Sequence, residues 1–221
     1  MQFRSMVGCL MYLTATRLDI LNAVSILSRF MHCPSEMHLK AAKRVFRYVK
    51  NTCNFGIKFE KCEEFKPIGY SDSDWGGSVD DLKSTSGYCF FLGSGAFSWC
   101  SKKQDIVAQS TAEAEFIAAT AAVNQALWLR KILVDLNLEQ KENTKILVDN
   151  QATIAISRNP VFHGKTKHFN IKLFFLREVQ QIGEVKLIYC KSECQVADMF
   201  TKPLSASRFE DLRDKLGVCS S

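Results

Sequence analysis

The sequence contains little proline and glycine, 4 and 11 among its 221 residues, so long unstructured linkers are not expected. No stretch approaches the roughly 18 uninterrupted apolar residues of a transmembrane helix, and no membrane partner is expected. The remaining composition, 47% hydrophobic and 24% charged, is typical of a globular protein. The chain is therefore expected to form one large domain, or a domain of about 150 residues with a smaller appendage.

The nine cysteines are odd in number and lack the regular spacing of a disulfide framework. This pattern favours reduced thiols and predicts an intracellular protein without structural disulfides. It argues against the class of small secreted domains whose stability comes from cross-links.

The excess of positive charge is confined to the start of the chain. The formal net charge is +6, yet residues 1–66 hold 11 Lys and Arg against 5 Asp and Glu, while residues 67–221 hold 18 of each kind. This asymmetry predicts a basic helical unit followed by a neutral α/β unit. The boundary is expected between Asn51 and Lys66, where the helical pattern lapses.

The helix expected after Pro34 has two distinct faces. Apolar residues recur at steps of three and four from Leu39 to Val49, which predicts a packed side. A second face carries the candidate nucleic-acid-binding residues Lys40, Lys43, Arg44 and Arg47. Two interpretations remain open for this stripe: a solvated helix surface, or a surface that binds nucleic-acid phosphates by releasing counterions.

Strand patterns replace helical ones after residue 66. Strand signals lie at 68–74, 88–92, 96–99, 145–149 and 184–190, and helix signals at 111–136, 151–158, 168–181 and 195–201. Three consecutive strands followed by strands separated by helices predict an α/β fold. The expected architecture is a mixed five-stranded sheet flanked by helices and preceded by a small basic helical segment.

Four acidic residues fall at the edge or in an early turn of different elements: Asp72, Glu115, Asp149 and Asp198. Carboxylates so far apart in the sequence converge only if the sheet gathers them. A gathered cluster repels itself unless hard cations neutralise it. Two Mg²⁺ ions about 4 Å apart are the usual solution, one activating water and the other stabilising the leaving oxygen of a phosphodiester.

Structural interpretations compete with the catalytic one at several acidic positions. Glu113 lies three residues after Ser110, so it is expected to bond the backbone of this helix cap rather than act in catalysis. Asp149 precedes a predicted helix and is equally well explained as a cap. Asp72 and Asp74 share one face of the expected strand, so the local pattern does not decide between them.

Several ordered sequence blocks resemble one known family. They include Gly69–Gly77, Lys83–Gly87, Ser110–Glu115, Asp149–Gln151 and Ala197–Pro203, together with Leu39–Arg44 near the start. These blocks resemble the ribonuclease H domain of copia-type LTR retrotransposon Pol polyproteins and the polymerase connection segment before it. The chain lacks a Tyr-x-Asp-Asp polymerase motif, so it resembles a C-terminal fragment of such a polyprotein.

The resemblance implies three parts of the chain. Residues 1–62 correspond to a helical polymerase connection or thumb-like remnant, residues 63–204 to a ribonuclease H-like domain, and residues 205–221 to a C-terminal tail helix. The implied partners are an RNA–DNA hybrid and the polymerase domain of the same polyprotein. The implied location is intracellular, in cytoplasmic particles or the nucleus.

The resemblance also implies an activity, the hydrolysis of the RNA strand of RNA–DNA hybrids by a metal-dependent endonuclease. The catalytic and metal-binding roles fall to Asp72, Glu115, Asp149 and Asp198, with two Mg²⁺ ions, or Mn²⁺ in their place, as cofactors. The alternative hypothesis is an inactive genomic remnant that folds as a nucleic-acid-binding or packing module. No histidine follows His168, so the histidine that often assists turnover in cellular ribonucleases H has no counterpart here.

Overall fold

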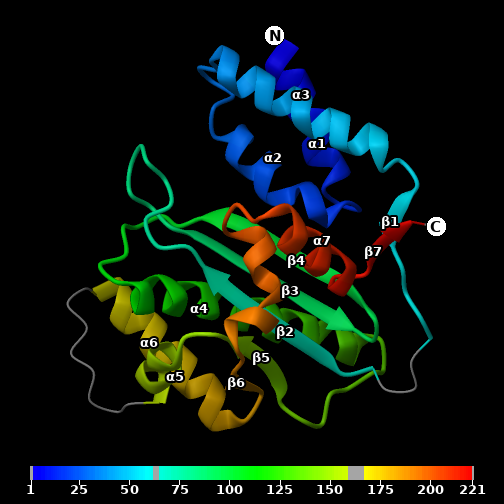
Figure 1. The fold of residues 1–221 in the computed structure, drawn as a ribbon. Helices are drawn as coiled ribbons and strands as arrows, with labels where there is room; N and C mark the ends of the chain where they lie inside the picture. Colours follow the sequence, from blue (N-terminus) through cyan, green and yellow to red (C-terminus); the bar gives the residue numbers. More distant parts are fainter. Residues whose placement is uncertain (1, 62–64, 159–166, 221) are drawn as a thin grey trace.

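The computed structural model describes residues 2–61, 65–158 and 167–220, and a five-stranded sheet lies at its centre (Figure 1). Its strands, in the spatial order β4-β3-β2-β5-β6, are β2 (Pro67–Ser73), β3 (Thr85–Leu92), β4 (Gly95–Lys103), β5 (Thr144–Val148) and β6 (Val185–Tyr189). The first three strands pair antiparallel, whereas β5 lies parallel to both β2 and β6. The predicted mixed five-stranded sheet is confirmed.

Helices cover both faces of this sheet. The helices are α1 (Gln2–Leu13), α2 (Leu21–Ser28), α3 (Glu36–Asn51), α4 (Thr111–Asp135), α5 (Gln151–Arg158), α6 (Lys167–Ile182) and α7 (Ala206–Lys215). Short 3₁₀ helices occupy η1 (Leu18–Ile20), η2 (Ser192–Cys194) and η3 (Val196–Phe200). The expected helix at 195–201 is thus a 3₁₀ helix, while those at 111–136, 151–158 and 168–181 match α4, α5 and α6 closely.

Successive side chains of β3 point to opposite faces of the sheet and into two different hydrophobic cores. Phe90 points into the first core, where it packs with Phe116 of α4 among residues of α6, β5 and β6. Its neighbour Cys89 points the other way, into a second core that contains Phe200 of η3 and Leu212 of α7. Successive side chains of a strand leave opposite faces, so this one strand belongs to both layers.

Helix α4 lies close against the sheet because its buried side carries several small residues. The buried alanines on it are Ala114, Ala118, Ala119, Ala122 and Ala126. The helix begins at the predicted cap, where the Ser110 hydroxyl accepts a hydrogen bond from the backbone N–H of Glu113 at 3.2 Å. The prediction that Glu113 bonds the cap residue in return is wrong, since its carboxylate accepts from the backbone N–H of Gln109 at 2.7 Å.

The N-terminal helices form a layer above the second core. Helix α2 lies against β4 and η3, and α3 packs on α1 and α2, on the side remote from the sheet (Figure 1). The following strand β1 (Phe55–Ile57) pairs antiparallel with β7 (Val218–Ser220), which brings the C-terminal residues beside this layer. The predicted division at 1–62, 63–204 and 205–221 stays a prediction, and its first boundary lies outside the described residues.

A buried polar network joins the loop after α1 to α3. The Arg17 guanidinium donates to both carboxylate oxygens of Asp19, at 2.9 and 2.7 Å, and to the carbonyl and hydroxyl of Thr52, each at 2.8 Å. Tyr48 donates its hydroxyl to the same Asp19 carboxylate at 2.7 Å. Burial, with the carboxylate adding to it, raises the pKa of Tyr48 to about 12, so this hydroxyl remains a donor.

Within the described residues, no helix is both long and apolar enough to cross a membrane.

Arg17→Met should lower the free energy of unfolding by about 3–5 kcal/mol, because it leaves the buried Asp19 carboxylate without its charged partner. The double variant Arg17→Met/Asp19→Leu should lower the free energy of unfolding by clearly less, since neither charge is then buried alone. Urea denaturation monitored by circular dichroism measures both. A double variant at least as unstable as Arg17→Met alone would contradict this account of the network.

Candidate active site

The sheet and α4 bring three of the four predicted acidic residues together. Asp72 is near the end of β2, Asp149 follows the adjacent parallel strand β5, and Glu115 lies in the second turn of α4. One carboxylate oxygen from each residue lies within 4.8 Å of those of the other two. The carboxyl ends of neighbouring parallel strands meet at one edge of a sheet, which explains why residues this distant in the sequence converge.

Two of these three carboxylates are poorly solvated. Asp72 and Glu115 retain 1% and 7% of their surface exposure. One Glu115 oxygen accepts a 3.3 Å hydrogen bond from the backbone N–H of Ser73, whereas the other is buried without a hydrogen-bond donor among the described residues. An acceptor of this kind is costly unless a cation or a proton satisfies it, so the residues fit a hard divalent ion.

Asp198 lies beside this acidic cluster, linked to it by a lysine. The Lys202 ammonium is 2.8 Å from Asp198 and 3.6 Å from Asp72. Thr201 donates its hydroxyl to the Asp72 carboxylate. The fourth predicted residue therefore shares a cation with the cluster, although it is outside the group of three oxygens within 4.8 Å.

A glycine on β3 allows η3 and the residues after it to approach the acidic cluster. Gly87 is the register partner of Asp72, and a Cβ at Gly87 would lie 2.7 Å from atoms of both Phe200 and Thr201. Any other residue at this position would push η3 outward. Asp198 and Lys202 reach the acidic cluster because this side chain is absent.

Burial changes the protonation of the acidic cluster. It raises the pKa of Asp72 to about 6; Lys202 opposes the change, while Asp198 and Asp149 add to it. Burial, together with the charges of Asp72 and Asp149, raises the pKa of Glu115 to about 9. Burial alone would lower the pKa of Lys202, but the charges of Asp72, Asp198 and Asp149 outweigh it and the pKa is raised.

Asp74 does not join the acidic cluster. Strand β2 ends at Ser73, so the alternation that would place Asp72 and Asp74 on one face stops before the second residue. The Asp74 carboxylate instead accepts a hydrogen bond from the backbone N–H of Thr85 and closes the loop between β2 and β3. Of the two candidates that the sequence left open, Asp72 has the geometry of a ligand.

The four predicted nucleic-acid-binding residues lie together on α3 and apart from the acidic cluster. Lys40, Lys43, Arg44 and Arg47 are all exposed, and no carboxylate among the described residues pairs with them. Helices α1 and α2 separate α3 from the sheet (Figure 1). They therefore form a free cationic surface rather than part of the acidic site.

Comparison with known proteins finds clear relatives of this chain, although no protein-family model matches it. The chain is 40% identical over 217 residues to the retrovirus-related Pol polyprotein from transposon RE1 of Arabidopsis thaliana. It is 37% identical over 222 residues to that from transposon TNT 1-94 of Nicotiana tabacum. These alignments cover 98% and 99% of this chain. Over nearly its whole length the chain is homologous to one segment of the retrovirus-related Pol polyproteins of copia-type transposons.

The match covers one segment of these Pol polyproteins, 15% of the RE1 protein and 16% of the TNT 1-94 protein. Secreted RxLR effector protein 161 of Plasmopara viticola is 45% identical over 128 residues, which are 58% of this chain and 90% of that protein. Among solved structures, LC11-RNase H1 isolated from compost aligns with 62% of this chain and 94% of its own chain, at 15% identity and a TM-score of 0.46. The Pol polyprotein relatives confirm the resemblance recognised from the sequence motifs.

Two buried glutamines that sequence reasoning missed hold the acidic cluster of this Pol segment in place. The Gln104 amide lies 3.2 and 2.9 Å from the hydroxyls of Ser73 and Ser86 and 3.0 Å from the Ala114 carbonyl, which ties the end of β2 to the start of α4. The Gln195 amide donates to the Ser71 carbonyl at 2.9 Å. Neither contact is local in the sequence, so no pattern signalled it.

Ser192 and Lys202 were also missed as members of the site. The Ser192 hydroxyl donates to the Asp149 carboxylate at 2.9 Å. Lys202 follows Asp198 by four residues in the block that resembles the family, which was the one available signal for it. A serine in a loop 43 residues from its partner carries no comparable signal.

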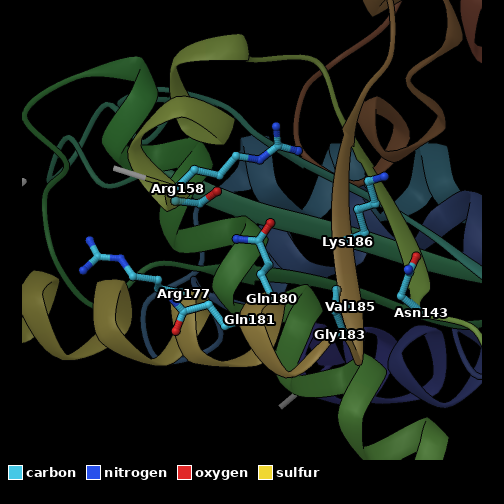
Figure 2. A pocket seen from close by; sticks show the side chains of 9 residues that line it. Asn143, Arg158, Arg177, Gln180, Gln181, Gly183, Val185 and Lys186 are labelled. Carbon is cyan, nitrogen blue, oxygen red and sulfur yellow. The ribbon is translucent and has the colours of Figure 1, made fainter. Parts of the chain in front are cut away.

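A cavity of about 320 Å³ lies at the other end of β5 and β6, lined in part by Asn143, Arg158, Arg177, Gln180 and Lys186. Asn143 precedes β5, whereas Asp149 follows it, so the strand separates this cavity from the acidic cluster. The side chains of Arg177 and Lys186 point apart, with Arg158 between them (Figure 2). Their charges do not converge on one point, and we assign no site there.

The raised pKa values predict how metal-free protein responds to pH. Between the ordinary carboxyl pKa of 4.5 and the value of about 9 for Glu115, the folded state keeps a proton that the unfolded state releases. The free energy of unfolding therefore falls as pH rises through this window. In EDTA, Glu115→Gln should melt at a higher temperature than the wild type, by a margin that grows from about pH 5 to about pH 8.

The matched control is Glu178→Gln, which changes an exposed carboxylate of α6. Its melting temperature should differ from that of the wild type by a margin independent of pH. Thermal unfolding in EDTA at both pH values decides the point. A Glu115→Gln margin as flat as that of the control would contradict the raised pKa of Glu115.

Proposed function

We propose that this Pol segment is a ribonuclease H, an endonuclease that hydrolyses the RNA strand of RNA–DNA hybrids during retrotransposon reverse transcription. The observation that carries the proposal is the convergence of Asp72, Glu115 and Asp149, with a buried Glu115 oxygen that lacks a donor among the described residues. This donor set consists of hard oxygen ligands, which suit Mg²⁺ and Mn²⁺. The motifs shared with the family support the same assignment.

Asp72, Glu115 and Asp149 would hold the metal ions, with Asp198 alongside. Two bound Mg²⁺ ions, or Mn²⁺ in their place, would supply an activated water and stabilise the leaving oxygen. The chain's own groups prepare the site: Ser192 orients Asp149, Thr201 orients Asp72, and the Gln104 amide fixes the position of Glu115 relative to β2. Hydrogen bonds to ligands set their orientation and basicity.

Lys202 compensates part of the negative charge of the site. Its ammonium lies between Asp198 and Asp72 and is 39% exposed, so it also faces solvent. An anionic phosphodiester that approaches four carboxylates meets repulsion, and a cation at this place reduces it. We expect Lys202 to favour the approach of the scissile phosphate.

The hybrid is the proposed substrate, and α3 is its proposed second contact. Four exposed cations on one helix gain affinity for any nucleic-acid backbone without reading sequence. Selectivity for RNA would come from A-like geometry and 2′-hydroxyl contacts nearer the acidic cluster. The polymerase domain as a partner, and a location in cytoplasmic particles or the nucleus, stay predictions.

Asp72→Asn and Asp149→Asn should each reduce cleavage of a labelled RNA–DNA hybrid about 100-fold or more, because each removes a metal ligand. EDTA should abolish cleavage. Asp74→Asn should keep most of the activity, since Asp74 closes a loop instead of facing the cluster. A gel assay with Mg²⁺ or Mn²⁺ measures all of these rates.

Two results would contradict the proposed nuclease. A folded and monodisperse wild-type protein that cuts hybrid with neither ion would favour the alternative of an inactive remnant. Full activity of Asp149→Asn would show that cleavage comes from another source. Loss of activity in Asp74→Asn alone would overturn the choice of Asp72.

Neutralising the four exposed cations of α3, as Lys40→Gln/Lys43→Gln/Arg44→Gln/Arg47→Gln, should weaken hybrid binding and flatten its salt dependence. The slope of log K against log salt should fall by roughly 0.9 for each phosphate that the helix no longer neutralises. Fluorescence anisotropy of a labelled hybrid at several salt concentrations, with Ca²⁺ replacing Mg²⁺, measures both quantities. Folding should be unaffected because all four residues are exposed.

The control removes the same charge elsewhere, from the exposed lysines Lys131, Lys141, Lys145 and Lys186. If both quadruple variants change the slope equally, the net charge of the protein is responsible and α3 is not a specific contact surface. An unchanged slope in the α3 variant would show that α3 does not contact the hybrid.

A further inference from the structure

We propose that Arg208 of α7 is a positioning residue for the acidic cluster, which it serves by fixing the loop segment Lys191–Gln195 against Asp149 and β2. This inference rests on the proposed function, in that the cluster must bind divalent cations. It gives α7, a helix outside the five-stranded sheet and its flanking helices α4 to α6, a role in the site.

Arg208 binds the backbone of this loop segment at three points. Its guanidinium donates to the carbonyl of Glu193 at 2.7 Å, to that of Ser192 at 2.9 Å and to that of Gln195 at 3.5 Å. The same guanidinium lies 3.6 Å from an Asp198 oxygen and 3.3 Å from Asp211. One side chain thus bonds two carbonyls within the short helix η2 and one immediately after it.

The loop segment in turn holds two strands of the site. Ser192 donates its hydroxyl to Asp149 at 2.9 Å, beyond the end of β5. Gln195 is fully buried and donates to the Ser71 carbonyl at 2.9 Å, one residue before Asp72. The segment therefore spans the two parallel strands that carry two of the three clustered carboxylates.

The segment is anchored at both ends, by the 2.9 Å bond from the backbone N–H of Cys190 to the Val148 carbonyl and by buried Gln195, but its first four residues have few other contacts among the described residues. Residues 191–194 are all exposed, so they gain no position from packing. The backbone bonds within it are those of one 3₁₀ turn, from Cys194 to Lys191 at 2.8 Å and from Gln195 to Ser192 at 3.2 Å. Between the two anchored ends, Arg208 is the side chain that holds the Ser192 backbone in place relative to Asp149.

Helix α7 gives the guanidinium a rigid base. Ser205 caps the helix, and Leu212 is fully buried in the second core. The planar guanidinium has five N–H donors in a fixed fork, whereas a lysine ammonium is a point charge that cannot hold three carbonyls in the same geometry. The role therefore requires arginine and not a positive charge alone.

Charge and positioning predict opposite effects on metal binding. Arg208 is a cation near Asp198, so removal of its charge alone would strengthen binding of a divalent cation by the carboxylates. Displacement of the loop would weaken binding, because Asp149 then lacks the hydrogen bond that orients it. The direction of the change identifies which effect dominates.

The experiment compares Arg208→Ala, Arg208→Lys and Ser192→Ala with the control Arg213→Ala. Arg213 lies on the same helix but stacks on the Phe55 ring at 4.7 Å and pairs with Asp214. Mn²⁺ binding to each full-length protein is measured by electron paramagnetic resonance, well below the melting temperature of each variant. Hybrid cleavage gives kcat and KM separately.

Arg208→Ala should weaken Mn²⁺ binding about 10- to 100-fold. Arg208→Lys should restore little of it, and Ser192→Ala should weaken binding in the same direction. The Arg208→Ala/Ser192→Ala double variant should bind Mn²⁺ as tightly as Arg208→Ala alone, because both changes act through one loop. In cleavage, kcat at fixed Mn²⁺ should fall and KM for hybrid should stay unchanged. Arg213→Ala should lower the melting temperature without changing Mn²⁺ affinity.

Unchanged or tighter Mn²⁺ binding by Arg208→Ala would overturn the proposal, and so would full rescue by Arg208→Lys. Wild-type protein that binds no Mn²⁺ would overturn it as well. Wild-type protein that binds Mn²⁺ without cutting hybrid would refute the nuclease, while weaker Mn²⁺ binding by Arg208→Ala would still support the positioning role. The two failures are therefore distinguishable.

Discussion

Three carboxylates with oxygens within 4.8 Å of one another repel each other, and the structure around them is arranged to withstand that repulsion. Each carboxylate comes from a different element, so the force acts between β2, β5 and α4. These elements are held by the strand ladder and by the packing of small α4 residues on the sheet. Partial protonation and the Lys202 ammonium relieve the repulsion in the absence of metal.

Buried amides resist the repulsion where packing alone would not. Gln104 links β2, β3 and the first turn of α4, and Gln195 links η3 to β2. Both are almost fully buried, so removal of a partner would leave an unsatisfied polar group in the interior. A small movement of β2 or of the start of α4 strains or breaks one of these bonds, which makes this part of the site stiff.

The sequence predicted the elements of the fold because their patterns are local. The long helix α4 has its cap at Ser110, and the sheet strands have their alternation, so both could be predicted from neighbouring residues. The four acidic residues could be named because each ends or begins an element and matches a family block. Asp72 could not be separated from Asp74, since the choice depends on β2 ending at Ser73.

What the sequence could not predict is contact between distant residues. The bond from Ser192 to Asp149 spans 43 positions, and that from Gln195 to Ser71 spans 124. Such pairs follow no periodicity in the sequence. Their partners are determined by where the sheet brings two chain segments, which is a property of the whole fold.

The N-terminal helices are attached to the sheet near the site, which bears on how the basic helix α3 relates to the acidic cluster. Trp99 of β4 donates its indole N–H to the Thr14 carbonyl at 3.1 Å, and Arg29 donates to the Thr85 hydroxyl at 3.1 Å. Thr85 starts the strand in which Gly87 faces Asp72. Direct bonds to β3 and β4 therefore locate the helical layer. A hybrid bound to both α3 and the carboxylates would meet two surfaces at a separation that the fold determines, and this separation selects the path of the substrate.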